Sequence, residues 1–331
     1  MTQQQNASWQ ITKPATRSRK GIVASQSRVA AQVGADVMAQ GGNAVDAAIA
    51  TSFALGAAEP WMSGMGGGGF MVVRMAGEKT AKVIEFGMKS PKGPDIADYP
   101  IVGCKAGDLF PWPSVLEDRN VFGAKAIAIP GQVAGMGLAH ESFATKPWAD
   151  LLAPAIKLAD DGLPVDWYTQ LILGGSAKDL APFPTSADTF LDEDGFPKSS
   201  GWTALGETKC DLGRLASSLR TVAKDGPRAF YEGPLAQSIV ADLQAALQRG
   251  APGKTSEELE GAEQGVRVSD QGGQDHEQDG GDQDQGHDEL DRVRTAHLQV
   301  LLDDGPTLGV HALELLVLDL LVAFEGDAID D

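Results

Sequence analysis

Cysteine and histidine are scarce in this 331-residue sequence. The two cysteines, Cys104 and Cys210, are too few for a disulfide framework and have no Cys-x-x-Cys spacing. They favour a reducing compartment, although a single bridge stays open. The five histidines include no His-Glu-x-x-His pair, so we predict no metal and no cofactor. We interpret His140 as a helix-surface residue rather than a catalytic base.

Long apolar runs are also missing. No signal-peptide run follows the basic residues 17–20, and residues 313–324 are too short for a membrane span and include Glu314 and Asp319. We therefore expect a cytoplasmic protein without a membrane partner. A periplasmic location stays open if the true start of the protein lies elsewhere.

Positive charge is nearly absent from the last quarter of the chain. The formal net charge is -19, and residues 256–331 hold 21 acidic residues against three arginines and no lysine. The rest of the chain is close to neutral, and we expect no nucleic-acid partner. Residues 265–291 mix Gln, Asp, Gly and His without an aromatic residue, so we predict that they are disordered.

Small residues and glycine dominate the stretch around which the rest is organised, residues 41–70. Gly41 and Gly42 suit a turn, Asn43 suits a helix N-cap, and a small apolar helix should run from there to Glu59. Four consecutive glycines then precede a predicted strand, which indicates close approach of backbone to backbone or to a ligand. The order helix, glycines, strand is the reverse of a dinucleotide fingerprint, so we do not predict nucleotide binding.

Other segments give a mixture of helices and antiparallel strands. We predict short strands at 21–25 and 126–129, a hairpin of 70–75 with 82–86, and a long ordered loop over 91–121. We predict helices at 28–40 with Ser27 as cap, at 133–143 and at 212–224, and a pair of short helices within 147–162. This pattern favours sheet layers flanked by helices.

The organising stretch carries a resemblance to a known family. Gly-Gly-Asn-Ala-Val-Asp-Ala-Ala at 41–48, followed by Ser-Gly-Met-Gly-Gly-Gly-Gly-Phe at 63–70, resembles the large-subunit signature of the gamma-glutamyltransferase (gamma-glutamyltranspeptidase) family of N-terminal-nucleophile hydrolases. Similar blocks recur at 130–135, 147–159 and 230–242. The resemblance implies an α/β (α+β) class with a four-layer αββα fold, incomplete here. We divide the chain into a flexible lead-in (1–20), the large-subunit region (21–245) and an unrelated acidic tail (246–331).

The resemblance also implies an activity. Family members transfer a γ-glutamyl group from glutathione or a related amide to an amino acid or water, through an acyl-threonine. That threonine opens the small subunit, beyond the point where this chain departs from the family. We therefore predict no catalytic residue in this chain, a missing small subunit as its partner, and no activity alone. One hypothesis is that the reading frame changes near residues 243–249.

Substrate recognition by the family uses an arginine in a segment of the form Asp-[Phe/Gly]-Arg-x-x-Ala-Pro. The matching segment here is 85–91, and Gly87 stands at the arginine position. Lys89 could offer a point charge to a substrate carboxylate, or could be an exposed loop lysine. The departure leaves room for an acylase or amidase subunit that takes non-glutamyl substrates. A non-catalytic interaction protein that uses the acidic tail is a further alternative.

Overall fold

A computed structural model describes residues 15–91, 95–106, 111–199, 207–249 and 321–323. The predicted disordered segment, most of the acidic tail and most of the lead-in lie outside these residues. Within them the helices are α1 (Arg28–Ala39), α2 (Ala44–Ala58), α3 (Gln132–Phe143), α4 (Trp148–Asp161), α5 (Trp167–Leu180), α6 (Pro184–Phe190), α7 (Gly213–Asp225) and α8 (Pro234–Arg249). Short 3-10 turns are η1 (Ile96–Asp98), η2 (Leu116–Asp118), η3 (Ala124–Ala126) and η4 (Pro227–Phe230).

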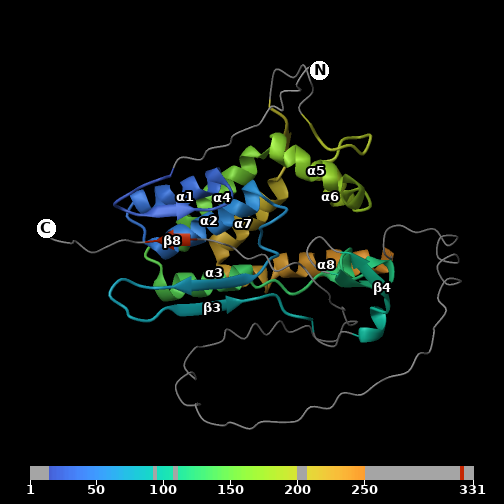
Figure 1. The fold of residues 1–331 in the computed structure, drawn as a ribbon, viewed down its shortest axis with the longest axis horizontal. Helices are drawn as coiled ribbons and strands as arrows, with labels where there is room; N and C mark the ends of the chain where they lie inside the picture. The colour runs from blue at the N-terminus through green and yellow to red at the C-terminus, as the bar shows by residue number, and fades with distance from the viewer. Residues whose placement is uncertain (1–14, 92–94, 107–110, 200–206, 250–320, 324–331) are drawn as a thin grey trace, which may run out of the picture.

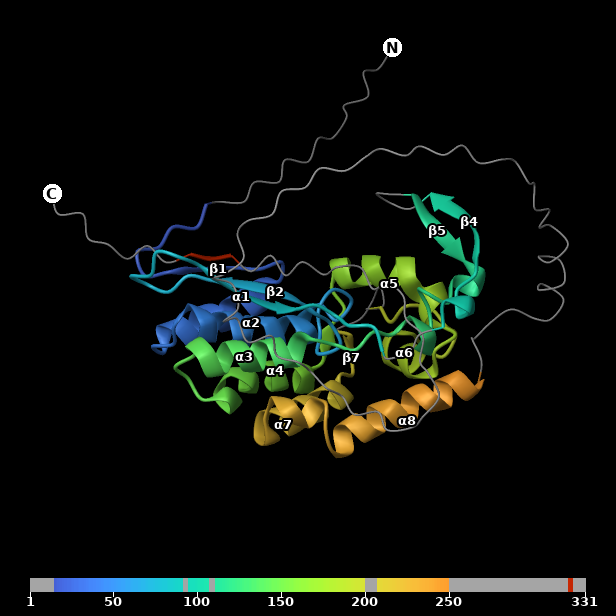
Figure 2. The ribbon, with the colours of Figure 1, turned by 90° about the horizontal axis from the view of Figure 1, so that it is seen from below.

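The strands form two-stranded antiparallel sheets. Their pairs are β1 (Ile22–Ala24) with β8 (Leu321–Ala323), β2 (Gly69–Val73) with β3 (Lys82–Phe86), β4 (Ile101–Ala106) with β5 (Pro111–Val115), and β6 (Leu163–Pro164) with β7 (Lys209–Cys210). Figure 2 shows β1 and β2 along one side of the helices, with α7 and α8 on the opposite side. The mixed α+β class and the incomplete fold are thus as expected.

Helix α2 lies at the centre of the molecule, against α1, α3 and α4 (Figure 1). All of its residues from Val45 to Ala57 are buried, because small side chains let neighbouring helices approach from every side. Gly34 of α1 is one such contact: a side chain there would overlap the Thr51 hydroxyl of α2. The sequence alone thus predicted the position and the small, apolar character of this helix.

The start of α2 is fixed by the carboxylate of Asp46, which is fully buried. One oxygen accepts hydrogen bonds from the Asn43 amide (2.7 Å) and the Thr145 hydroxyl (2.6 Å). The other accepts from the amides of Thr145 (2.9 Å) and Lys146 (3.0 Å). Burial alone would raise the pKa of Asp46, but these hydrogen bonds outweigh it and hold the pKa below its ordinary value. Asp46 therefore joins α2 to the α3–α4 loop as an ionised carboxylate.

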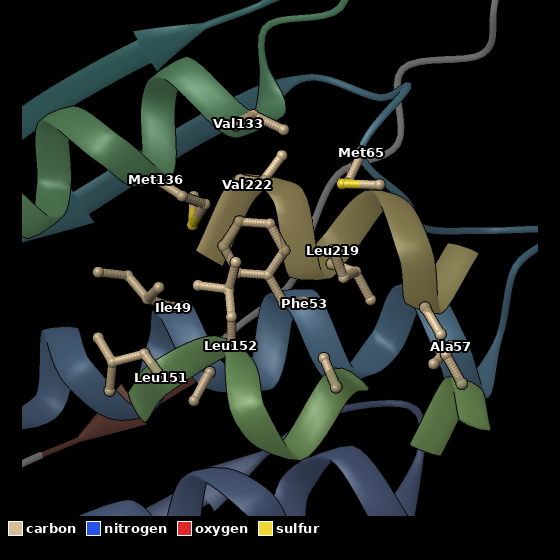
Figure 3. Close-up of a cluster of buried hydrophobic side chains, with 14 of the residues drawn as sticks. Ile49, Phe53, Ala57, Met65, Val133, Met136, Leu151, Leu152, Leu219 and Val222 are labelled. Carbon is tan, nitrogen blue, oxygen red and sulfur yellow. The ribbon is translucent and has the colours of Figure 1, made fainter. Parts of the chain in front are cut away.

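The main core fills the space between α2, α3, α4 and α7. Figure 3 shows the side chains from these helices pointing toward one another. They include Ile49 and Phe53 of α2, Val133 and Met136 of α3, Leu151 and Leu152 of α4, and Leu219 and Val222 of α7. Each large side chain buried in this way contributes about 1.5–3 kcal/mol.

Several predicted elements are confirmed. The helix over 28–40 is α1 with Ser27 as its cap, and the hairpin is β2 with β3. The helices predicted at 133–143 and 212–224 correspond to α3 and α7, and the strand at 21–25 is β1.

Three predictions were wrong. Residues 91–121 are not a long loop, because β4 and β5 pair within them. The prolines of β5 are compatible with this, since both strands are edges. Residues 126–129 make a single bridge, between Ile129 and Lys89, instead of a strand. Residues 148–161 form one helix, α4, because its buried stripe continues past Pro154.

Most of residues 313–324, on which the membrane prediction was based, lie outside the described residues. None of the described helices is both long and apolar enough to cross a bilayer. Cys210 is a buried free thiol.

Candidate functional site

The glycine bend, residues 64–68, connects α2 to β2. Helix α2 ends at Ala58 with Glu59 as its C-cap, and the Glu59 carbonyl accepts hydrogen bonds from the amides of Met62 (3.0 Å) and Ser63 (3.1 Å). Within the bend, the Gly67 amide donates to the Gly64 carbonyl at 3.1 Å. A helix precedes the bend and a strand follows it, so the bend does not present a helix N-terminus to a dinucleotide.

Three chain segments meet at this bend, and we call their meeting point the glycine node. Its members are residues 67–68, 86–89 and 129–132. The Gly67 carbonyl accepts hydrogen bonds from the amides of Gly131 (2.9 Å) and Gln132 (3.0 Å). A side chain at Gly68 would lie 2.7 Å from the Phe86 carbonyl oxygen, and one at Gly131 would overlap the same carbonyl. The segments therefore touch through backbone atoms, which only glycine permits at these positions.

Phe86 is held at the node by its ring as well as by its carbonyl. The ring is buried against α3 at Gly135, where any added side chain would overlap it. Three residues further on, the amide of Lys89 donates to the Ile129 carbonyl at 3.1 Å, and the amide of Ile129 donates back at 2.8 Å. Residues 87 and 88 are thus fixed at both ends.

The two candidate substrate-binding positions lie on this fixed segment. Gly87 is exposed, and a side chain built there would meet no atom within 4 Å. The Lys89 side chain is also exposed and makes no ion pair with a described residue. The structure therefore brings both positions to one open surface. Whether Lys89 holds a carboxylate stays a prediction.

A buried polar pair lies beneath the bend. The Gln132 side-chain amide donates to the Ser52 hydroxyl, and both residues are almost wholly buried. Together with Gly64 and Met65 they line a cavity of about 10 Å³, which is room for no more than a single water molecule. This cavity is therefore too small to hold a substrate.

Tyr231 supports the node from a segment 97 residues beyond Ala134 in the sequence. Its hydroxyl oxygen accepts a hydrogen bond from the Ala134 amide at 3.0 Å, in the first turn of α3, where Gly131 offers no side-chain cap. Burial raises the pKa of Tyr231 to about 12, so the phenol stays neutral. Sequence analysis missed Ser52, Gln132 and Tyr231. Polar residues within small, apolar blocks were the signal that could have revealed the first two.

Glu59 is a second buried carboxyl near the bend. It is 6% exposed, and none of the described residues donates a hydrogen bond to its side chain. Burial raises its pKa. It therefore differs from Asp46, whose charge is compensated.

Neither His140 nor the metal-ligand side chains of the described residues form a catalytic cluster. His140 lies partly buried on α3, where its Nε2 contacts the Lys146 carbonyl at 2.8 Å and its ring packs edge-on against Trp148. It lines a groove of about 630 Å³ between α3 and the α7–η4 corner. On the rim of this groove Arg228 pairs with Glu232 at 2.9 Å and Lys224 with Asp225 at 3.9 Å. The described residues hold no group of three or more metal-ligand side chains.

Comparison with known proteins decides the family. The family described as Gamma-glutamyltranspeptidase matches residues 30–256. The chain belongs to this family. The match extends to residue 256, past residue 245, where we had placed the end of the large-subunit region.

Individual relatives include both amidase types that the sequence suggested. The chain is 36% identical over 227 residues to an Acylase ACY 1 proenzyme of Pseudomonas sp. (strain V22), covering 69% of this chain and 38% of that protein. It is 33% identical over 236 residues to a Glutathione hydrolase proenzyme of Escherichia coli (strain K12), covering 69% and 37%. Among solved structures, the gamma-glutamyltranspeptidase of Helicobacter pylori matches with a TM-score of 0.60 and 26% identity, over 70% of this chain and 62% of that one.

The chain thus spans less than two fifths of the length of these curated relatives. It is a partial gamma-glutamyltranspeptidase-like protein with the N-terminal-nucleophile hydrolase fold in incomplete form.

Proposed function

We propose that this chain is the large-subunit half of a gamma-glutamyltransferase or glutathione hydrolase. In this role it helps to transfer a γ-glutamyl group from glutathione or a related amide to an amino acid or water. The observation that carries the proposal is the glycine node, which fixes residues 87–89 through backbone contacts and leaves Gly87 and Lys89 exposed. A rigid, exposed platform suits the alignment of a substrate against a nucleophile.

The attacking group comes from a partner polypeptide in this proposal. In the family the nucleophile is a threonine that opens the small subunit, and its own α-amino group can act as base because its pKa lies near neutrality. The chain's small share of its relatives' length supports a missing second part. No residue of this chain is assigned a catalytic role, and the chain alone should be inactive.

Lys89 is the group that this chain offers to the substrate α-carboxylate. Its exposed ammonium, two residues from Gly87, supplies a point charge in place of the planar bidentate clamp of an arginine. The open space at Gly87 marks where that arginine would fit.

A related acylase is the second candidate function. The absence of an arginine at Gly87 favours it, and so does the similarity to Acylase ACY 1. An acyl group without an α-carboxylate would need no cation and could occupy the free space at Gly87. The interaction role of the acidic tail concerns residues outside the described ones.

The test combines the chain with the small-subunit part of a relative and compares two anilides. γ-Glutamyl-p-nitroanilide carries the α-carboxylate, and 4-aminobutyryl-p-nitroanilide lacks it. The proposal expects kcat/KM to favour the γ-glutamyl compound at least about tenfold, equivalent to about 1.4 kcal/mol. Lys89→Ala should remove most of this preference through KM, while Gly87→Arg should increase it.

The controls separate the alternatives. Lys79→Ala, on the exposed β2–β3 turn, should leave both rates unchanged. Equal rates for both anilides would instead support the acylase. Turnover by the chain alone would contradict the missing nucleophile.

A further inference from the structure

The first turn of α3 is held to the glycine bend by a main-chain carbonyl. Helix α3 begins at Gln132, and Gly131 before it offers no side-chain cap. The Gly67 carbonyl takes the place of that cap, because it accepts hydrogen bonds from the amides of Gly131 (2.9 Å) and Gln132 (3.0 Å). The bend and the start of α3 therefore form one unit, and Gly68 joins this unit to the Phe86 carbonyl.

The side chain of Gln132 fixes this unit against the central helix. It reaches from the start of α3 to Ser52 in α2, where its amide donates to the serine hydroxyl. Gln132 is 4% exposed and Ser52 is 3% exposed, so bulk water cannot readily replace either partner of this bond. Gln132 thus connects three elements: α2 through its side chain, the bend through its main-chain amide, and α3, to which it belongs.

The stability of the core does not require a polar pair at this position. The other large side chains around the small cavity beneath the bend are all apolar: Phe53, Met65, Leu215 and Leu219. A neutral hydrogen bond adds little net stability here, because the unfolded chain bonds the same groups to water, and two apolar side chains of the same shape could pack as well. What the hydrogen bond adds is a defined direction, which selects one arrangement of the groups that it joins.

The small cavity explains why this direction matters. Glutamine has several rotatable bonds, and the space of about 10 Å³ beside Gln132 leaves room for its side chain to turn. A second contact between α2 and the bend lies at Gly56, where an added side chain would be 3.2 Å from the Gly64 Cα. That contact is one of van der Waals packing and has no preferred direction. The Ser52 hydroxyl therefore sets the orientation of Gln132.

We propose that Gln132 is a positioning residue for the glycine node. Its bond to Ser52 holds the start of α3, and with it the bend, in the arrangement that presents residues 87–89 to the substrate. The effect on the reaction rests on the proposed function, whereas the effect on the bend does not. A displaced platform would still bind the substrate but would align it less well with the nucleophile, so the loss should appear in kcat rather than in KM.

Hydrogen exchange of the full chain tests the effect on the bend. Ser52→Ala removes the acceptor and leaves Gln132 in place, whereas Ser52→Thr keeps the hydroxyl and can place its added methyl group in the cavity. In Ser52→Ala the amides of Gly131 and Gln132 should exchange at least about tenfold faster than in the wild type. In Ser52→Thr they should stay within about threefold of the wild type.

The same variants, combined with the small-subunit part of a relative, test the effect on the reaction. With γ-glutamyl-p-nitroanilide, Ser52→Ala should lower kcat about tenfold or more and leave KM within about threefold of the wild type. Ser52→Thr should restore most of kcat. A loss that is merely structural would reduce the amount of folded enzyme without this division between kcat and KM.

The matched control is Thr51→Val. Thr51 is fully buried in the same helix, its hydroxyl donates to the Ala47 carbonyl at 2.7 Å, and it faces Gly34 of α1 rather than the bend. Thr51→Val therefore removes one buried hydroxyl, as Ser52→Ala does, and should change neither the exchange of the two amides nor kcat.

Three outcomes would overturn the proposal. They are unchanged exchange in Ser52→Ala, equal acceleration in Thr51→Val, and faster exchange in Ser52→Ala with an unchanged kcat. A wild-type complex that hydrolyses no anilide would contradict the proposed function instead. The exchange rates alone would then decide whether Gln132 holds the bend.

Discussion

Replacing Asp46 with Asn tests how the central helix is anchored. Four donors point at the two carboxylate oxygens: the amides of Asn43, Thr145 and Lys146, and the Thr145 hydroxyl. In Asp46→Asn the side-chain oxygen can still serve the amides of Thr145 and Lys146. The new NH₂ group then faces the Thr145 hydroxyl, which can rotate to accept, and the Asn43 amide, which cannot.

The expected loss follows from these contacts. One buried amide left without an acceptor costs about 1–3 kcal/mol, and the retained bonds lose the extra strength that a charged acceptor gives. Together these effects should lower the free energy of unfolding by about 2–4 kcal/mol at pH 7.

Urea denaturation followed by circular dichroism measures this loss. Asp36→Asn is the matched control, since Asp36 is an exposed aspartate of α1 that accepts one bond from Gln32 at 2.8 Å. It should change stability by less than about 0.5 kcal/mol. Because the folded-state pKa of Asp46 is lowered, its contribution is present above the ordinary pKa of 3.8 and is lost as the pH falls through the folded value. The gap between wild type and Asp46→Asn should therefore narrow as the pH falls below about 3.8. An Asp46→Asn variant as stable as the control at pH 7 would refute the reasoning.

Three further predictions concern the node and its surroundings. Gly131→Ala should lower the free energy of unfolding by about 3 kcal/mol, because the new methyl group overlaps the Phe86 carbonyl. Gly87→Ala places its methyl group in open space and should change the free energy of unfolding by less than about 0.5 kcal/mol in the same urea assay. Equal effects of the two substitutions would contradict the backbone contact. Tyr231→Phe should lower the free energy of unfolding by about 1–3 kcal/mol and speed hydrogen exchange at the Ala134 amide. Tyr168→Phe, which loses only an exposed 3.4 Å contact to Gln26, serves as the control. An unchanged exchange rate in Tyr231→Phe would show that Tyr231 does not cap α3. Glu59→Gln should be more stable than the wild type at pH 7, because the folded-state pKa of Glu59 is raised and its ionised form opposes folding. This difference in stability should shrink as the pH falls toward 4.5. A variant less stable than the wild type at pH 7 would show that the carboxylate has a partner.

Local signals predicted the elements that depend on nearby residues. The cap at Asn43, the small residues of α2 and the β2–β3 hairpin could be read from the sequence because each depends on contacts within a few positions. Tyr231 and Ala134 could not be linked in this way, since 97 residues separate them. The continuity of α4 through Pro154 depends on core packing that a local pattern does not reveal.

In the candidate site, too, the sequence predicted what depends on local pattern and not what depends on contacts between distant segments. The family pattern identified Gly87 and Lys89, and the glycines predicted a close approach of backbone to some neighbour. Which neighbours these are, Phe86 and the Gly131 segment, depends on how distant segments fold together.

The node joins its segments almost entirely through main-chain atoms, and this has an evolutionary consequence. Under the proposed function, mutations at the two outward positions, 87 and 89, alter what the surface recognises without disturbing the scaffold beneath it. Descendants of one ancestral protein can therefore diverge in their preferred amides while keeping the same architecture.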